Sequence, residues 1–547
     1  MKSGINTLLA SIALGLSSSV MAQTIALQNV NLIDVEALSV NKAQTIIIED
    51  DKIKQIVPVR SRRFADDVIK IDLAGMYVIP GLIDTHVHHA TSPDDSDNDE
   101  ITRTRLRQLL QGGVTSVRDM GGDTRALSSL KRRADNDIIQ SPDIYYSVII
   151  GGKAFFSDPR TVASAKGEIP GAVDWMRAVD EHSDFDAIML RSKGLGATGI
   201  KIYANVPGSV VAKLSQAAKN NDLKVWSHAF IGPATPLEAV NGGVETISHA
   251  ADFAAQVIEN FYDMRRKNVA LTEQQKSDAK QLDAYQTLIK EMKNKGAILD
   301  STLTVFDKTK ASRGEKGLLL NKWGGLFTQL AHQAGVTIAA GTDVTSDRFN
   351  TVTPMVHHEM QLLVERAGLT PLEALQAATI NGAKVIGIEK QTGSIKAGKT
   401  ANLVVLNSDP SIEITNSQNI VHVIKNGQFI HLGDNEKLPF VMAREAAGLL
   451  FLSGQLGNLP TTMALAGNGI STQMTQAMKN IGFVLQDHNL DFNDVVKCTL
   501  MLADIKDWPL ANKAYTPFFT KLPARSAFAA SGLALGAKVE VECIAAL

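Results

Sequence analysis

The sequence predicts an α/β protein built on a (β/α)8, TIM-like barrel, and three observations support this. Short apolar strands alternate with helical segments between residues 81 and 384, and several of these strands end on a histidine, a lysine or an aspartate. The chemistry of such barrels collects at the C-terminal ends of the parallel strands, so one barrel mouth would gather these side chains. The length of 547 residues exceeds one ordinary core, which predicts further domains beside the barrel.

The first barrel strand is expected to end on a pair of histidines. The segment PGLIDTHVHH, residues 80–89, is an apolar run that reaches His86 and His88. Side chains at i and i+2 of an extended strand lie on the same face, so both imidazoles can share one metal ion. A rigid strand end also holds such donors in place. The pair predicts a metal site, whereas His89 faces the other side of the strand and has a structural role.

Later strands carry further polar side chains. Lys201 lies inside the apolar run GIKIY, VWSH and TISH end on His228 and His249, and AAGTD ends on Asp343. A lysine in a barrel strand can also have a purely structural role, in which its stem is buried and its ammonium group reaches solvent. The histidines at neighbouring strand ends favour a metal ligand instead.

One tyrosine and one histidine are expected to lie near the reacting groups. Tyr203 follows Lys201 by two residues, lies on the same strand face and is predicted to donate a hydrogen bond to substrate; packing in the core is the alternative. His357 begins the helix after the last barrel loop and is predicted to contact substrate at the barrel mouth, with an exposed helix start as the alternative.

These motifs together resemble the amidohydrolase superfamily, specifically its imidazolonepropionase-like and prolidase-like metal-dependent hydrolases. The resemblance covers roughly residues 23–435 and includes LTPLEALQAAT and GSIKAG between residues 369 and 398. It implies two divalent metal ions, with zinc expected. The implied ligands are His86, His88 and Asp343 for the more buried ion, His228 and His249 for the more exposed ion, and Lys201 as a carbamate that bridges both.

The implied chemistry is hydrolysis of a carbon–nitrogen bond. A lysine with a free pKa near ~10.4 loses its proton more readily in an apolar strand beside dications, and the neutral amine can capture carbon dioxide. Two ions about 3.5 to 4 Å apart would lower the pKa of a shared water toward ~7. Asp343 would take the proton of the attacking hydroxide and deliver it to the leaving nitrogen. A small amide, an Xaa-Pro or other dipeptide, a cyclic amide or an N-acyl amino acid is the expected substrate.

Strand-rich segments flank the predicted barrel. Residues 23–80 alternate apolar and polar side chains with turn signals, and a second such stretch returns at 385–435. We expect the two to form one β-sandwich domain beside the barrel at 81–384. Residues 255–296 are rich in Glu, Lys, Gln and Ala at helical spacing, and they predict an insertion over the barrel mouth that acts as a lid.

The first 22 residues have the pattern of a signal peptide. Lys2 precedes an apolar stretch, Leu8 to Leu16, which small residues follow up to Ala22. The stretch is shorter than the roughly 20 residues that span a bilayer. Cleavage near Ala22 and a periplasmic or secreted protein without membrane anchoring are expected.

Residues 438–547 show a second resemblance. Their motifs FLSGQ, PARS and VEVE are similar to those of the reactive-intermediate deaminase (Rid, or YjgF) family. The resemblance implies an α+β domain that forms trimers with sites between subunits. Arg525 would bind the carboxylate of an imine or enamine, Glu540 would position water and Asn512 would lie beside them; a trimer-interface ion pair is the alternative for Arg525. Ala527 stands where many members carry cysteine.

Composition excludes some partners and leaves the cysteines open. The formal net charge is -2 with 20% charged residues, which provides no basic field for nucleic acid. Cys498 and Cys543 both fall in predicted strands of the tail. Free buried thiols are expected, and a disulfide is the alternative in an oxidising compartment.

Three functional classes follow from these observations. The favoured one is an exported binuclear metal hydrolase with a fused imine-handling domain, assembled through its tail as a trimer or a multiple of it. The second is a mononuclear deaminase of the same superfamily, which would not need Lys201. The third is a non-catalytic exported binding protein in which the tail trimerises an inactive barrel.

Overall fold

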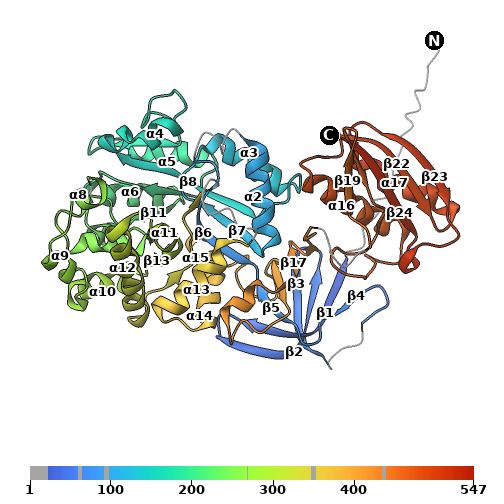
Figure 1. Ribbon diagram of the computed structural model, residues 1–547, viewed down its shortest axis with the longest axis horizontal. Helices are drawn as coiled ribbons and strands as arrows, with labels where there is room; N and C mark the ends of the chain where they lie inside the picture. The colour runs from blue at the N-terminus through green and yellow to red at the C-terminus, as the bar shows by residue number, and fades with distance from the viewer. Residues whose placement is uncertain (1–22, 60–63, 92–97, 268, 346–352, 434–438) are drawn as a thin grey trace, which may run out of the picture.

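The computed structural model describes residues 23–59, 64–91, 98–267, 269–345, 353–433 and 439–547. Figure 1 shows a barrel with surrounding helices, a flanking sheet beneath it and a separate tail domain at the C-terminal end. The expected signal peptide lies outside the described residues. Within them, no helix combines the length and the apolar character that crossing a membrane requires.

The barrel is confirmed as a parallel sheet that closes on itself. Its last segment contributes both β14 (Ile338–Ala339), which pairs with the preceding strand, and β15 (Val344–Thr345), which pairs with the first strand, so one stretch of chain closes the circle. In order around the sheet the other strands are β6 (Leu82–His88), β7 (Val114–Asp119), β8 (Asp143–Gly152), β10 (Gly199–Ile202), β11 (Lys224–His228), β12 (Thr246–Ser248) and β13 (Ile298–Asp300), with β9 (Met176–Val179) beside β8.

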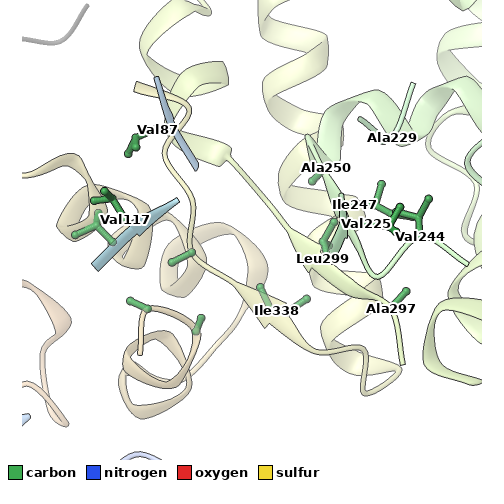
Figure 2. Close-up of a cluster of buried hydrophobic side chains, with 14 of the residues drawn as sticks. Val87, Val117, Val225, Ala229, Val244, Ile247, Ala250, Ala297, Leu299 and Ile338 are labelled. Carbon is green, nitrogen blue, oxygen red and sulfur yellow. The ribbon is translucent and has the colours of Figure 1, made fainter. Parts of the chain in front are cut away.

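Strand alternation gives this barrel two different faces. The buried apolar cluster contains Val87 and Ile200, each directly beside a predicted ligand in sequence, and Val225, three residues before His228. Figure 2 shows Val225 and Ile247 in the same cluster as residues of further strands. Because successive side chains of a strand point to opposite faces, the apolar set packs on one face and leaves the other for polar groups.

The helices that surround the barrel begin and end at recognisable signals. Thr235 and Thr370 each form a reciprocal capping box with the glutamate three residues later. Among the described helices, three end at a left-handed glycine, Gly296, Gly368 and Gly387. The helices between strands are α2 (Asp99–Gln111), α3 (Thr124–Asp135), α4 (Pro159–Ser164), α5 (Phe185–Gly194), α6 (Gly208–Asn220), α7 (Pro236–Asn241), α13 (Met355–Ala367), α14 (Pro371–Ala377) and α15 (Ile380–Ile386).

The expected insertion is helical and packs beside the barrel mouth. It forms α8 (Phe261–Arg266), α9 (Glu273–Asp278) and α10 (Gln286–Lys295), and it is followed after β13 by α11 (Leu303–Thr309) and α12 (Gly314–Gln333). A separate buried cluster joins α8 with α11 and α12, whereas α10 packs on the main barrel core through Leu288, Ile289 and Met292. The cluster includes Phe261, Met264, Phe306, Leu320 and Trp323.

The two strand-rich stretches that flank the barrel join in one 8-stranded sheet. The junction is the antiparallel pairing of β5 (Tyr77–Pro80) with β16 (Leu403–Leu406). The remaining strands are β18 (Gln428–Phe429) and β17 (Ile420–Lys425) beyond β16, and β1 (Thr24–Asp34), β2 (Ser39–Glu49) and β3 (Lys52–Pro58) beyond β5, with β4 (Ile69–Asp72) beside β1.

The tail is the expected α+β domain. Helices α16 (Ile470–Asp487) and α17 (Trp508–Tyr515) contribute to its core beside a 6-stranded sheet. Helix α16 also contacts the segment that follows the flanking sheet. There, Nδ1 of His431 lies 3.0 Å from Oδ2 of Asp487, the last residue of the helix. The strands are β19 (Ala443–Ala446), β20 (Leu449–Leu452), β24 (Val539–Ala546), β22 (Val495–Leu502) and β23 (Ala524–Ala529), with β21 (Gln455–Leu456) beside β24.

The expectation of free thiols in the tail is wrong. Cys498 on β22 and Cys543 on β24 are directly opposed in the antiparallel register, and they form a disulfide with Cα atoms 4.1 Å apart. The two residues are 45 positions apart in sequence, so only the strand register brings them together.

Candidate metal centre

The first strand and the last barrel segment bring three predicted ligands together. Oδ1 of Asp343 lies 3.2 Å from Nε2 of His88 and 3.5 Å from Nε2 of His86. The ligand atoms of all three residues lie within 4.8 Å of one another, which is the grouping of a metal site. Nitrogen and carboxylate donors of this kind suit zinc and similar divalent ions.

The remaining predicted ligands continue this group. The ring of His249 is centred 4.9 Å from that of His86 and 4.6 Å from that of His228. Nδ1 of His249 lies 4.0 Å from Oδ2 of Asp343. Lys201, on the strand before His228, is completely buried. The imidazoles therefore form a continuous row across the C-terminal ends of β6, β11 and β12.

Three residues near the ends of barrel strands have an unusual backbone conformation at this centre. His249, Thr302 and Asp343 have φ angles of 75°, 49° and 55°, in the left-handed region. A non-glycine residue there carries a strain of order 1–3 kcal/mol, and such residues gather at functional sites. His249 directly follows β12, Thr302 lies two residues beyond β13, and Asp343 directly precedes β15.

Asp300, at the end of β13, is a functional residue that the sequence analysis missed. Its Oδ2 accepts hydrogen bonds from Nδ1 of His86 at 2.8 Å, Nη2 of Arg118 at 2.9 Å and Oγ of Ser248 at 2.8 Å. Its Oδ1 accepts from Oγ1 of Thr85 at 3.0 Å. Binding the Nδ1 proton fixes the tautomer of His86 and leaves Nε2 as the metal donor. The signal was available, because AILD ends a strand on aspartate just as AAGTD does.

Close packing around Asp300 explains the glycine of AAGTD. A Cβ atom at Gly341 would overlap Oδ1 of Asp300 and would lie 2.7 Å from Cβ of His86. Only glycine lets the last barrel segment approach the first strand this closely. The approach brings Asp343 to the histidine pair.

Burial sets the charges of this centre. It lowers the pKa of Lys201 to about 7, with the nearby Arg118 adding to the effect, and it lowers the pKa of His86 to about 4 and that of His249 to about 3. Burial would raise the pKa of Asp343, but the hydrogen bond from His88 and the neighbouring imidazoles hold it well below its usual range. Burial would lower the pKa of His88 too, but the hydrogen bond to Asp343 and its charge raise it. The neutral rings of His86 and His249, an amine that readily loses its proton and a carboxylate are protonation states that metal ligands need.

Two buried atoms show that these residues fit a metal ion. Within the described part of the chain, neither Nε2 of His86 nor Nζ of Lys201 has a hydrogen-bond partner. A buried polar atom without a partner costs about 1–3 kcal/mol. Coordination to a metal, directly or through a carbamate, would remove that cost for both atoms.

A cavity of about 640 Å³ opens directly onto the centre. His88, His228, His249 and Asp343 line it, and so does Tyr203. The ring of Tyr203 stacks on Phe155 at 4.8 Å and lies 4.1 Å from that of His228. Tyr203 is thus placed where it can meet a substrate bound beside the histidines.

The structure corrects the expectation for His357. This residue is only 2% exposed and does not line the cavity. Its Nε2 donates to the carbonyl oxygen of Gly112 at 3.0 Å and its Nδ1 accepts from Oγ of Ser417 at 2.8 Å. The buried face of α13 holds the ring against neighbouring loops, so both nitrogens are used and neither reaches substrate.

Glu359, on the same helix, supports the centre from behind. Its fully buried carboxylate accepts hydrogen bonds from the backbone nitrogens of Leu303 at 2.9 Å and Thr304 at 2.7 Å. These residues follow Thr302, whose Oγ1 lies 2.9 Å from Nδ1 of His249. Glu359 therefore fixes the loop that orients His249, and nothing in the sequence pattern marked it.

Glu359 is expected to make stability depend on pH. Burial raises its pKa to about 8 in the folded chain. Between the unfolded pKa near ~4.3 and that value, the folded state binds more protons, so its contribution to stability falls as pH rises. Glu359→Gln removes this titration, and urea unfolding at pH 5 and pH 8 should show a smaller decrease in stability than for the natural chain. The exposed Glu365→Gln on the same helix is the control, and an unchanged pH dependence in Glu359→Gln would contradict the assignment.

The predicted residues of the tail do not converge within one chain. In the sheet register Arg525 lies beside Cys498 and Glu540 opposite Met501, on the two strands that flank β22. Cys498 and Met501 are an odd number of residues apart, so Arg525 and Glu540 point to opposite faces. The Arg525 guanidinium lies 5.1 Å from the ring centre of Tyr515, and Asn512 is on α17.

Comparison with known families decides the affiliation of the main domain. A family model described as "Amidohydrolase family" matches residues 77–430, more than half of the chain. The chain belongs to the amidohydrolase family. A second model, described as "Endoribonuclease L-PSP", matches residues 435–547. This amidohydrolase superfamily member therefore carries a Rid (YjgF) domain after its barrel.

Individual relatives agree with the assignment of the tail, and each matches about a fifth of this chain. Reactive Intermediate Deaminase A, chloroplastic, from Arabidopsis thaliana is 41% identical over 110 residues, which are 20% of this chain and 59% of that relative. The 2-iminobutanoate/2-iminopropanoate deaminase of Mus musculus is 38% identical over 108 residues, 20% of this chain and 80% of its own. The chain thus spans less than two thirds of the plant relative.

The larger part of this amidohydrolase has the fold of a solved enzyme structure. A Xaa-Pro dipeptidase with methionine bound in its active site superposes with a TM-score of 0.60 at 22% identity. The superposition covers 74% of this chain and 99% of that chain. The matched 74% of this chain is more than the barrel at residues 81–384 comprises, so the shared fold extends beyond the barrel.

Proposed function

We propose that this protein is an exported, binuclear metal-dependent amidohydrolase that cleaves a carbon–nitrogen bond in an Xaa-Pro dipeptide or an N-acyl amino acid. One observation carries the proposal. The imidazoles of β6, β11 and β12 meet Asp343 at the floor of the cavity, where Nε2 of His86 and Nζ of Lys201 have no hydrogen-bond partner among the described residues. The Xaa-Pro dipeptidase of the same fold supports the choice of substrate.

The ligand residues divide between two ions. His86, His88 and Asp343 would hold one ion, and His228 and His249 the other. Lys201 would bridge them after its neutral Nζ forms a bond to the carbon of carbon dioxide and releases one proton, which gives a carbamate. Bound there, the metal ions would supply Lewis acidity and an activated water.

The chain's own groups then orient the substrate and move the proton. The carboxylate of Asp343, kept ionised by its neighbours, can accept a proton and pass it to the leaving nitrogen. Tyr203 can donate a hydrogen bond to the substrate from the cavity wall. Asp300 keeps His86 in one tautomer, and Glu359 keeps the loop beside His249 in place.

The test is a substrate screen with a ligand variant as control. Protein without its first 22 residues, loaded with zinc, is assayed against dipeptide and N-acyl amino acid libraries beside Lys201→Ala. We expect hydrolysis of some members by the natural chain and a loss of at least about 10- to 100-fold in Lys201→Ala, because removal of a mere hydrogen-bond partner of a metal ligand already costs this much activity. Equal rates for both proteins would reject the bridging role of Lys201.

A mononuclear aminohydrolase is the second candidate, and one observation favours it. In the part of the chain that the structure describes, the ligand atoms that lie within 4.8 Å of one another belong to His86, His88 and Asp343. That group alone could hold one ion. A single bound ion per chain, with full activity in Lys201→Ala, would select this function.

Export and assembly are part of the proposal. The charged, apolar and small residues of the first 22 positions support export, and the Cys498–Cys543 disulfide suits an oxidising compartment. Because Arg525 and Glu540 lie on opposite faces within one chain, an imine site in the tail would need a second subunit, as in a trimer. The mass of the polypeptide recovered from the periplasm shows whether the first 22 residues have been removed, which tests export. The mass of the protein in solution gives the number of subunits, which tests assembly.

A further inference from the structure

The wall of the cavity opposite the metal centre carries several cations. Arg265 on α8 and the residues Arg313 and Lys316 at the start of α12 all line the cavity. We refer to these three residues as the cationic wall. Phe306 stands between this wall and the metal centre, with its ring centred 6.3 Å from that of His249 and 6.0 Å from the Arg265 guanidinium.

The carboxylate beside the wall orients one of its cations. Asp252 is only 5% exposed, and its two oxygens lie 3.0 Å and 3.1 Å from Nε and Nη2 of Arg265. Nη2 donates a hydrogen bond to Oδ2, whereas the approach of Nε to Oδ1 is an ion-pair contact, and together they hold the guanidinium beside Asp252. Among the described lining residues, the other carboxylate is that of Asp343, which belongs to the metal centre, whereas Arg160 adds a further cation on another side. Positive charge therefore exceeds negative charge in this lining.

The cations of the wall are close enough to repel one another. Burial lowers the pKa of Lys316, and the charges of Arg265 and Arg313 lower it further. Its Nζ donates to the carbonyl oxygen of Met264 at 3.4 Å, which holds the ammonium group at the cavity. Like charges gathered in a cleft destabilise the free protein and attract anions. Cations that line a cavity in this way favour an anionic ligand there.

We propose that the cationic wall selects acidic substrates, namely dipeptides or N-acyl amino acids that carry a second carboxylate in addition to the one of their own C-terminus. This inference rests on the proposed function and names its substrate class. With the scissile bond at the metal centre, the substrate chain passes Phe306 and places its distal carboxylate against Arg265, Arg313 and Lys316. The planar guanidinium groups suit bidentate binding of a carboxylate.

Matched substrates test this selection. The zinc-loaded protein is assayed with pairs that differ only in Glu against Gln, in either residue of a dipeptide and in an N-acetylated amino acid. We expect kcat/KM to be about tenfold to hundredfold higher for the acidic member of at least one pair, the range for a charge-assisted hydrogen bond. The double variant Arg313→Gln, Lys316→Gln, which leaves Arg265 in place, should lower that ratio at least several-fold, while Lys322→Gln, an exposed lysine on the same helix, should leave it unchanged.

A binding measurement separates failure of this inference from failure of the proposed function. Calorimetric titration with glutarate, a dicarboxylate, is made against 4-carbamoylbutanoate, its monoamide, in the natural chain and in the double variant. Tighter binding of glutarate by the natural chain alone supports the wall even if no substrate is cleaved, in which case the hydrolase proposal fails by itself. Equal kcat/KM for acidic and neutral members, or an acidic preference that is undiminished in the double variant, overturns the inference while leaving hydrolysis intact.

Discussion

Replacement of Asp343 by Asn is expected to lower kcat by about 10²- to 10⁴-fold, the range that a positioned general base contributes. Asparagine keeps the shape of the side chain and tolerates the left-handed backbone at this position, so the fold should remain. It cannot accept the proton that must reach the leaving nitrogen. Steady-state kinetics on the best substrate of the screen measures the effect.

A matched control isolates the chemistry from the backbone. Asp222 also has a left-handed backbone, with φ 56°, but it is exposed and lies outside the cavity. Asp222→Asn should therefore retain the activity of the natural chain. If Asp343→Asn were as active as Asp222→Asn, Asp343 would have no part in proton transfer.

Removal of the Asp300 carboxylate is expected to produce the largest loss of stability. Asp300→Ala would leave the guanidinium of Arg118, which is fully buried, without its ion-pair partner and would free Nδ1 of His86. Breaking a buried pair by removing one partner costs about 3–5 kcal/mol. Urea unfolding followed by circular dichroism should show this decrease in the free energy of unfolding.

An exposed ion pair provides the comparison for Asp300. Asp135 lies 3.1 Å from Lys131 on the surface of α3, and exposed pairs of this kind contribute roughly 0–1 kcal/mol. Asp135→Ala should accordingly change stability little. Similar small losses in both variants would mean that Asp300 does not hold the interior of the barrel together.

The barrel and most of its metal ligands could be predicted because their signals are local. A histidine or aspartate that ends an apolar strand is visible in a few residues, and the topology of the barrel brings all strand ends together. His86, His88 and Asp343 follow this rule, and their ligand atoms meet as expected. The assignment of the amidohydrolase and Rid families also came from such short motifs.

The remaining features depend on contacts between distant segments. Arg118 and Asp300 are 182 positions apart, and only the closed barrel makes them partners. His357 was misplaced because the helical pattern does not tell which face of α13 the neighbouring loops cover. The disulfide likewise depends on the register of β22 and β24, which the separate strand patterns do not define.

Metal content per chain tests the two-metal assignment most directly. Purified protein, loaded with zinc and passed through a desalting column, is measured by inductively coupled plasma mass spectrometry beside Lys201→Ala and the control Lys322→Gln. Four imidazoles, a carboxylate and a bridging lysine predict about two ions per chain in the natural protein and in Lys322→Gln, and about one or none in Lys201→Ala. About two ions retained by Lys201→Ala, or no ion bound by the natural chain, would contradict the assignment.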